Sequence, residues 1–182
     1  MAVLDTPVCD FGWKAQDFKL KDPDGKEYSM TEAMGENGLL VAFICNHCPY
    51  VKAVIGRLVA DAKVLQEEGF GVLAVMANDY ESYPDDSPNE MRRFAAEHKF
   101  TFPYLVDEDQ SVAKSYDAVC TPDFFGFNRD FELQYRGRLD DAERGDASDR
   151  VPELLNAFRH IAKTGAGPKE QTPSMGCSMK WR

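Results

Sequence analysis

The sequence lacks any apolar run that approaches the roughly 18 residues a membrane-spanning helix needs. It also lacks a block of consecutive basic residues. Its 21 Lys and Arg residues are outnumbered by 31 Asp and Glu residues, which gives a net charge of −10. An acidic protein repels phosphate groups, so we expect neither nucleic acid nor a membrane surface as a partner. Residues 1–12 contain Asp5 and Asp10 instead of the basic and apolar stretches of a secretory signal, which predicts a cytoplasmic location.

Cysteine is present in five copies, an odd number that does not fit a framework of paired disulfides. Hydrophobic residues make up 43% of the 182-residue chain, and a chain of this length buries roughly 70% of its unfolded surface on folding. Its stability therefore does not depend on disulfide bonds. In a reducing compartment such thiols are more often catalytic, metal-binding or inert core residues.

The spacing of apolar residues and turn signals predicts strands that alternate with helices. In chain order we expect a hairpin over 17–30, a strand over 39–44, a helix over 51–65, a strand over 71–76, a helix over 88–98, a strand over 104–106, a helix over 110–116, a hairpin over 124–135 and a helix over 152–162. This order predicts an α/β fold with a central mixed sheet flanked by helices and an N-terminal hairpin extension. Gly, Pro, Lys and Ser dominate residues 164–182, which predicts an irregular C-terminal tail after a domain of residues 1–163.

The strongest chemical signal lies where the buried strand over 39–44 meets the following helix. There the chain contains Cys45, His47, Cys48 and Pro49, and proline suits the first turn of a helix. A thiol at a helix N-terminus meets free backbone N–H groups and the positive end of the helix dipole, which stabilise the thiolate. Cys48 has this position, whereas Cys45 lies in or just past the strand. His47 adds positive charge when it is protonated.

Two further cysteines occur in distinctive contexts. Cys120 precedes Thr121 and Pro122. The peptide bond before a proline is the one that can adopt the cis form, and the residues alone do not decide whether the Thr121–Pro122 bond is cis or trans. Cys177 lies in a polar tail that also contains Trp181. Either the apolar tail residues hold this segment against the body with Cys177 as a bystander, or Cys177 is a mobile thiol that reaches the reactive cysteine.

A metal site is the alternative to redox chemistry. Its ligands would be Cys45, His47 and Cys48, with Cys120 or Cys177 as a further ligand, in a metal- or partner-binding protein without turnover. The sequence has no second close-spaced ligand pair of the kind that structural zinc sites use. We therefore expect no metal and no cofactor.

Three segments together carry a resemblance to a known family: residues 43–52, 120–123 and 173–178. The order of elements over 17–163 resembles the thioredoxin fold. The three segments are similar to a peroxiredoxin-like subgroup of the alkyl hydroperoxide reductase and thiol-specific antioxidant (AhpC/TSA) type. The resemblance implies a thiol oxidoreductase with an antioxidant or redox-homeostasis role. It also implies a peroxide or protein disulfide as substrate and a thioredoxin- or glutathione-type protein or thiol as reductant. The assembly to test for is a homodimer.

The resemblance also assigns roles to residues. Aligning Phe43 with the family's aromatic residue places the nucleophile at Cys48 and the second cysteine of the usual motif at Val51. In the rival register Cys45 is the nucleophile and Cys48 its partner, but Pro49 and the helical periodicity favour Cys48. Cys45 then stands where the peroxiredoxin pattern has a threonine that helps to orient the peroxide, and a thiol is a weaker hydrogen-bonding group than a hydroxyl.

The same resemblance implies a cis bond before Pro122, in a turn that packs against the active cysteine and in which Thr121 offers backbone groups to a substrate thiol. The family's catalytic arginine comes from late in the fold, where Arg136 and Arg138 are the candidates. The thiols that could resolve an oxidised Cys48 are Cys45, Cys120 and Cys177, whereas Cys9 has no motif around it and receives no role.

Overall fold

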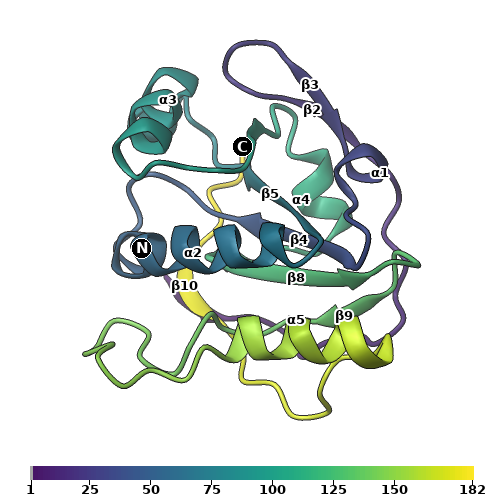
Figure 1. The fold of residues 1–182 in the computed structure, drawn as a ribbon. Helices are drawn as coiled ribbons and strands as arrows, with labels where there is room; N and C mark the ends of the chain where they lie inside the picture. Colours follow the sequence, from purple (N-terminus) through teal and green to yellow (C-terminus); the bar gives the residue numbers. More distant parts are fainter. Residues whose placement is uncertain (1) are drawn as a thin grey trace.

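The computed structural model describes residues 2–182 and contains one central sheet (Figure 1). Its strands are β2 (Lys19–Lys21), β3 (Glu27–Ser29), β4 (Gly38–Phe43), β5 (Phe70–Met76), β6 (Tyr104–Val106), β8 (Asp123–Asn128) and β9 (Leu133–Tyr135). They lie in the order β3-β2-β6-β5-β4-β8-β9. β4, β5 and β6 are parallel, while β8 pairs antiparallel with β4. The predicted mixed sheet, with its hairpin extension, is confirmed.

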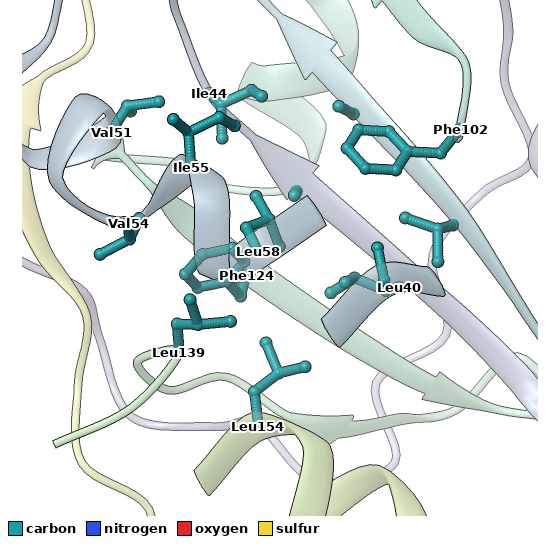
Figure 2. Close-up of a cluster of buried hydrophobic side chains, with 14 of the residues drawn as sticks. Leu40, Ile44, Val51, Val54, Ile55, Leu58, Phe102, Phe124, Leu139 and Leu154 are labelled. Atoms are coloured by element: carbon teal, nitrogen blue, oxygen red, sulfur yellow. The ribbon is translucent and has the colours of Figure 1, made fainter. Parts of the chain in front are cut away.

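Helices cover both faces of this sheet. The helices are α1 (Met30–Ala33), α2 (Pro49–Glu67), α3 (Pro88–Glu97), α4 (Ser111–Ser115) and α5 (Glu153–Thr164), with a 3-10 turn η1 (Pro84–Asp86) before α3. Alternate residues of β4 belong to opposite cores: Leu40 packs on the α2 and α5 side, and Val41 on the side of α1 and α4. Figure 2 shows Ile55 and Leu58 of α2 in the same buried cluster as Ile44 and Phe124, with Leu58 beside the Phe124 ring of β8. The continuous apolar run of β4 is therefore buried on both faces, as its sequence predicts.

The boundaries of two helices follow from local sequence signals. The Ser87 side chain accepts a hydrogen bond from the Glu90 backbone N–H, and Pro88 occupies the first turn of α3. Cys48 is the residue that caps α2, with Pro49 in the first turn. None of the helices within residues 2–182 combines the length and the apolar character needed to cross a membrane.

The C-terminal tail departs from the prediction. Residues 175–178 form strand β10 (Met175–Ser178), which pairs antiparallel with β1 (Val3–Asp5) on one edge and with β7 (Cys120–Thr121) on the other. Figure 1 shows β10 beside the first turn of α2. The prediction of an irregular tail is wrong for these residues, because their backbone groups find partners on both sides. The alternative of a mobile Cys177 is wrong for the same reason.

Packing also fixes the end of the chain. Met179 is buried, and the Lys180 backbone carbonyl accepts a hydrogen bond of 2.8 Å from the Asp79 backbone N–H. The Asn78 side chain accepts the Lys180 N–H at 2.9 Å. These contacts match the alternative in which the tail is held against the body, although Trp181 itself is 43% exposed.

Candidate functional site

Cys48 lies at the junction of β4 and α2 with no solvent-exposed surface. As the cap residue it precedes the free N–H groups of the first helical turn, and the nearby N–H of Val51 contributes to lowering the pKa of its thiol without forming a cap hydrogen bond. The N-terminus of α2 therefore directs partial positive charge at the Cys48 thiol.

The loop around Pro122 forms a second side of the site. The Thr121–Pro122 peptide bond is cis, as the resemblance implies. The protonated Cys48 thiol donates to the Thr121 carbonyl oxygen, with a sulfur–oxygen distance of 3.3 Å. The sulfur of Cys45 lies 3.4 Å from the hydroxyl oxygen of the same threonine. Thr121 thus contacts both cysteines of the strand–helix junction.

β10 forms the third side. Cys177 is the register partner of Thr121 and belongs to the same buried cluster as Cys45 and Cys48. Cys45, Cys48 and Cys177 are therefore gathered around one point. Cys120 is in the neighbouring β7 position, but its thiol donates to the Pro122 carbonyl oxygen at 3.8 Å. All five thiols are free, including the half-buried Cys9.

The three neighbouring thiols differ in pKa because their surroundings differ. Interaction with the Cys45 thiol, together with the Cys177 thiol and the N–H groups of Val51 and Cys177, lowers the pKa of Cys48 to about 4, against the opposing effect of burial. The pKa of Cys45 is raised well above 9.0 by its interaction with Cys48, by burial and by the charge of Asp86. Burial and Cys48 raise the pKa of Cys177 to about 11. Cys48 is accordingly the thiolate of the cluster.

This separation predicts a two-step titration. Near pH 4 we expect one thiol, Cys48, to ionise, and the next of the cluster, Cys177, only near pH 11. The measurement is the ultraviolet absorbance of thiolates against pH in the wild type and in Cys48→Ser, which should lose the acidic step. Absence of any wild-type step below about pH 8 would contradict the assignment.

The lowered pKa of Cys48 also makes the stability of the fold depend on pH. Folding lowers the pKa of Cys48 from 9.0 to about 4, so the thiolate stabilises the native state fully above pH 9. This contribution declines as the pH falls and is lost as the pH passes below 4. The difference in unfolding free energy between wild type and Cys48→Ser should therefore shrink on acidification.

Asp86, in η1, is a site residue that the sequence did not reveal. Its fully buried carboxylate accepts hydrogen bonds from the Asn46 backbone N–H at 2.8 Å and from the Asn78 amide at 3.0 Å. Nδ1 of His47 lies 2.7 Å from its Oδ2, in a direction that does not meet hydrogen-bond geometry. Burial opposes ionisation of Asp86, but His47 and these donors hold its pKa below the usual value. Asp86 in turn raises the pKa of His47, while burial opposes this increase.

A small cavity of about 190 Å³ lies between the first turns of α2, the cis-proline loop and the residues that lead into β10. Its wall includes the apolar side chains of Val54, Phe124 and Leu139, together with Pro122 of the cis-proline loop. Arg144 also lines it, with its guanidinium 4.7 Å from the centre of the Tyr50 ring. Arg138, Asp140 and Glu143 complete the lining, so the cavity combines an apolar wall with charged groups of both signs, close to the cis-proline loop that contacts Cys48.

Comparison with known proteins agrees with this geometry. The model of the AhpC/TSA family matches residues 11–139. The chain belongs to the AhpC/TSA family. Membership of this family supports thiol-based oxidoreductase chemistry in general, in accord with the thiolate at Cys48. No curated protein matches the chain.

The solved structures similar to this AhpC/TSA family member include the following three. An uncharacterised conserved protein from Geobacillus kaustophilus is 39% identical, with a TM-score of 0.93 over 100% of this chain and 97% of that one. A hypothetical protein from Sinorhizobium meliloti is 35% identical, with a TM-score of 0.91 over 98% and 97%. The thioredoxin domain of a Bacteroides vulgatus thiol-disulfide oxidoreductase is 16% identical, with a TM-score of 0.64 over 84% and 97%. This last likeness shows the thioredoxin-like fold.

The two arginines that the family resemblance names as candidates for the catalytic arginine are each paired with carboxylates. Arg136 donates to the Asp123 carboxylate through Nε at 3.2 Å and NH2 at 2.9 Å. Arg138 pairs with Glu153 and Glu143, both at 2.8 Å. Among the described interactions of Cys48, the pKa-lowering partners are thiols and backbone N–H groups, not an arginine. A catalytic role for either arginine stays a prediction.

The predicted metal ligands come together in a different combination. Ligand atoms of Cys45, His47 and Asp86 lie within 4.8 Å of one another. Asp86 replaces Cys48 in this set. The arrangement offers one thiol, one imidazole and one carboxylate, which are ligand types that zinc accepts.

Proposed function

We propose that this AhpC/TSA family member is a thiol oxidoreductase in which the Cys48 thiolate attacks a peroxide or a disulfide. The observation that carries the proposal is the position of Cys48 at the N-terminus of α2, between Cys45 and Cys177, with its pKa lowered to about 4. A thiolate is the reactive form of cysteine, and at neutral pH this residue is ionised.

The two reactions differ in the product at sulfur. With a peroxide, Cys48 takes one oxygen, becomes a sulfenic acid, and releases water or an alcohol. With a disulfide, Cys48 forms a mixed disulfide and releases the other half as a thiolate. In both cases a second thiol then forms a disulfide with Cys48. A thioredoxin- or glutathione-type reductant would supply the two electrons and two protons that restore both thiols.

Burial favours a small oxidant as the first substrate. Cys48 has no exposed surface and β10 lies against it, so a peroxide reaches the sulfur more easily than a folded protein disulfide. Against this, Cys45 occupies the position of the family's peroxide-orienting threonine, and its thiol is a weaker hydrogen-bonding group.

The test is a direct comparison of the two activities. Reduced protein is mixed with hydrogen peroxide or with insulin, and peroxide consumption and insulin reduction are followed with a thioredoxin-type and then a glutathione-type reductant. We expect turnover with peroxide to exceed that with insulin. Turnover with insulin alone would favour the disulfide substrate, and turnover with neither would contradict the proposal.

Metal binding without turnover is the second candidate, favoured by the proximity of Cys45, His47 and Asp86. The hydrogen bonds that Asp86 already accepts from Asn46 and Asn78 leave less of its carboxylate free for a metal. Metal analysis of protein purified without chelator separates the candidates. Stoichiometric zinc that disappears in Asp86→Asn would favour this second candidate over the first.

A further inference from the structure

We propose that Cys177 is the thiol that resolves oxidised Cys48, through a disulfide within one chain, and that β10 positions it for this purpose. The inference rests on the proposed function, because it needs Cys48 as the residue oxidised first. It selects one of several thiols that the sequence alone leaves open, and it gives the C-terminal strand a chemical role.

The backbone register brings the two cysteines together. Cys177 lies opposite Thr121 in the β10–β7 pair, and the Thr121 carbonyl oxygen lies 3.3 Å from the Cys48 sulfur. β10 also packs against α2, the helix that Cys48 caps, and the thiol and backbone N–H of Cys177 contribute to lowering the pKa of Cys48. Cys48 and Cys177 also belong to the same buried cluster, so the register places the two thiols on the same side of the cis-proline loop, and disulfide formation requires their sulfur atoms to meet at about 2 Å.

The contacts on either side of Cys177 hold it in place. A Cβ atom on Gly176 would collide with the Thr121 carbonyl oxygen, so glycine permits the close approach of β10. The Ser174 hydroxyl donates to the Pro122 carbonyl oxygen at 2.8 Å. The Ser178 backbone N–H donates to the Ala2 carbonyl oxygen at 2.8 Å. Cys177 is therefore a fixed neighbour of Cys48.

Cys45, the competing thiol, is in a less favourable environment. Its sulfur is paired with the Thr121 hydroxyl, and the buried Asp86 carboxylate is part of its surroundings. Ligand atoms of Cys45 and Asp86 lie within 4.8 Å of each other. The negative charge of the carboxylate therefore opposes formation of the Cys45 thiolate, which is the form that would have to attack oxidised Cys48. Burial and Cys48 raise the pKa of Cys177 to about 11, but the nearby charges of Lys180 and Arg144 are positive and act in the opposite direction, toward its thiolate.

The proposed step balances as follows. The Cys48 thiolate attacks one oxygen of hydrogen peroxide, so the S–O bond forms and the O–O bond breaks. The other oxygen leaves as hydroxide and takes a proton from solvent to become water. Cys48 is thereby oxidised to a sulfenic acid and the peroxide is reduced. The Cys177 sulfur then attacks the Cys48 sulfur and forms the S–S bond. The S–O bond breaks, and the oxygen leaves as water with the proton from the Cys177 thiol.

The experiment maps the disulfide formed after oxidation at pH 8. Reduced protein receives an equimolar amount of hydrogen peroxide, free thiols are alkylated, and peptides are analysed by mass spectrometry. The variants Cys177→Ser and Cys45→Ser form a matched pair, with circular dichroism to verify folding. We expect a Cys48–Cys177 disulfide in the wild type and in Cys45→Ser. In Cys177→Ser, the sulfenic acid on Cys48 should persist at least about tenfold longer, because the intramolecular partner is lost.

The outcomes separate the two proposals. A Cys45–Cys48 disulfide in the wild type, or an unchanged sulfenic acid lifetime in Cys177→Ser, would overturn the role of Cys177 while leaving Cys48 as the nucleophile. If Cys48 is oxidised neither by peroxide nor by a low-molecular-weight disulfide, the proposed function itself fails. The wild-type peptide map gives a result even if a variant does not fold.

Discussion

Replacing Cys48 with serine is expected to lower the rate of reaction with peroxide or disulfide by at least about 10³-fold, as is typical for removal of a catalytic nucleophile. The serine hydroxyl is not ionised at neutral pH, whereas the pKa of the Cys48 thiol is lowered to about 4. The measurement is the initial rate of oxidant consumption under single-turnover conditions, with folding verified by circular dichroism.

Two other cysteine variants provide controls for this loss. Cys120→Ser changes a fully buried thiol whose pKa is raised, chiefly by burial, so its rate should match that of the wild type. Cys45→Ala removes the largest cause of the low pKa of Cys48. It should therefore move the pH profile of the reaction to higher pH instead of abolishing the reaction. Wild-type rates in Cys48→Ser would exclude Cys48 as the nucleophile.

Local sequence patterns determine much of the fold and part of the site. The strand β4, the helix α2 and the position of Cys48 at their junction follow from a buried apolar run, a 3- and 4-residue periodicity and Pro49. The turn at Asn128 is equally local, since its side chain accepts the backbone N–H groups of Asp130 and Glu132. These signals act over a few residues, so they can be recognised in a single sequence.

The parts that the sequence did not predict depend on distant partners. β10 is short and follows a polar, glycine- and proline-rich segment, and it becomes a strand because β1 and β7 lie on its two edges. Asp86 has no motif around it, and its role arises because packing brings η1 against Asn46 and His47. Such tertiary pairing leaves no periodic signal in the residues themselves.

Replacing Arg136 with methionine is expected to destabilise the protein by about 3–5 kcal/mol, the usual consequence of removing one partner from a buried ion pair. Arg136 is 7% exposed and Asp123 is fully buried, and two hydrogen bonds join them. The guanidinium also donates to the Asp117 carbonyl oxygen at 2.9 Å and lies 4.4 Å from the centre of the Phe125 ring. The substitution leaves the Asp123 carboxylate buried without its cation.

Arg138→Met is the matched control, because this arginine is 21% exposed and its carboxylate partners are partly exposed. Ion pairs of this kind contribute up to about 1 kcal/mol each, so the loss should be much smaller. A double variant, Asp123→Asn with Arg136→Met, removes the unpaired charge and should recover part of the stability lost in Arg136→Met. Denaturant unfolding at neutral pH measures all three differences.

The same variants distinguish a structural from a catalytic arginine. Asp123 directly follows the cis Pro122, and its carboxylate also accepts the Val119 backbone N–H at 3.2 Å. The ion pair therefore anchors the loop whose Thr121 carbonyl contacts Cys48. If Arg136 acts only through this anchor, folded Arg136→Met should keep the acidic titration of Cys48, and its oxidation rate should fall together with its unfolding free energy. Loss of oxidation with unchanged unfolding free energy would instead assign Arg136 to the reaction.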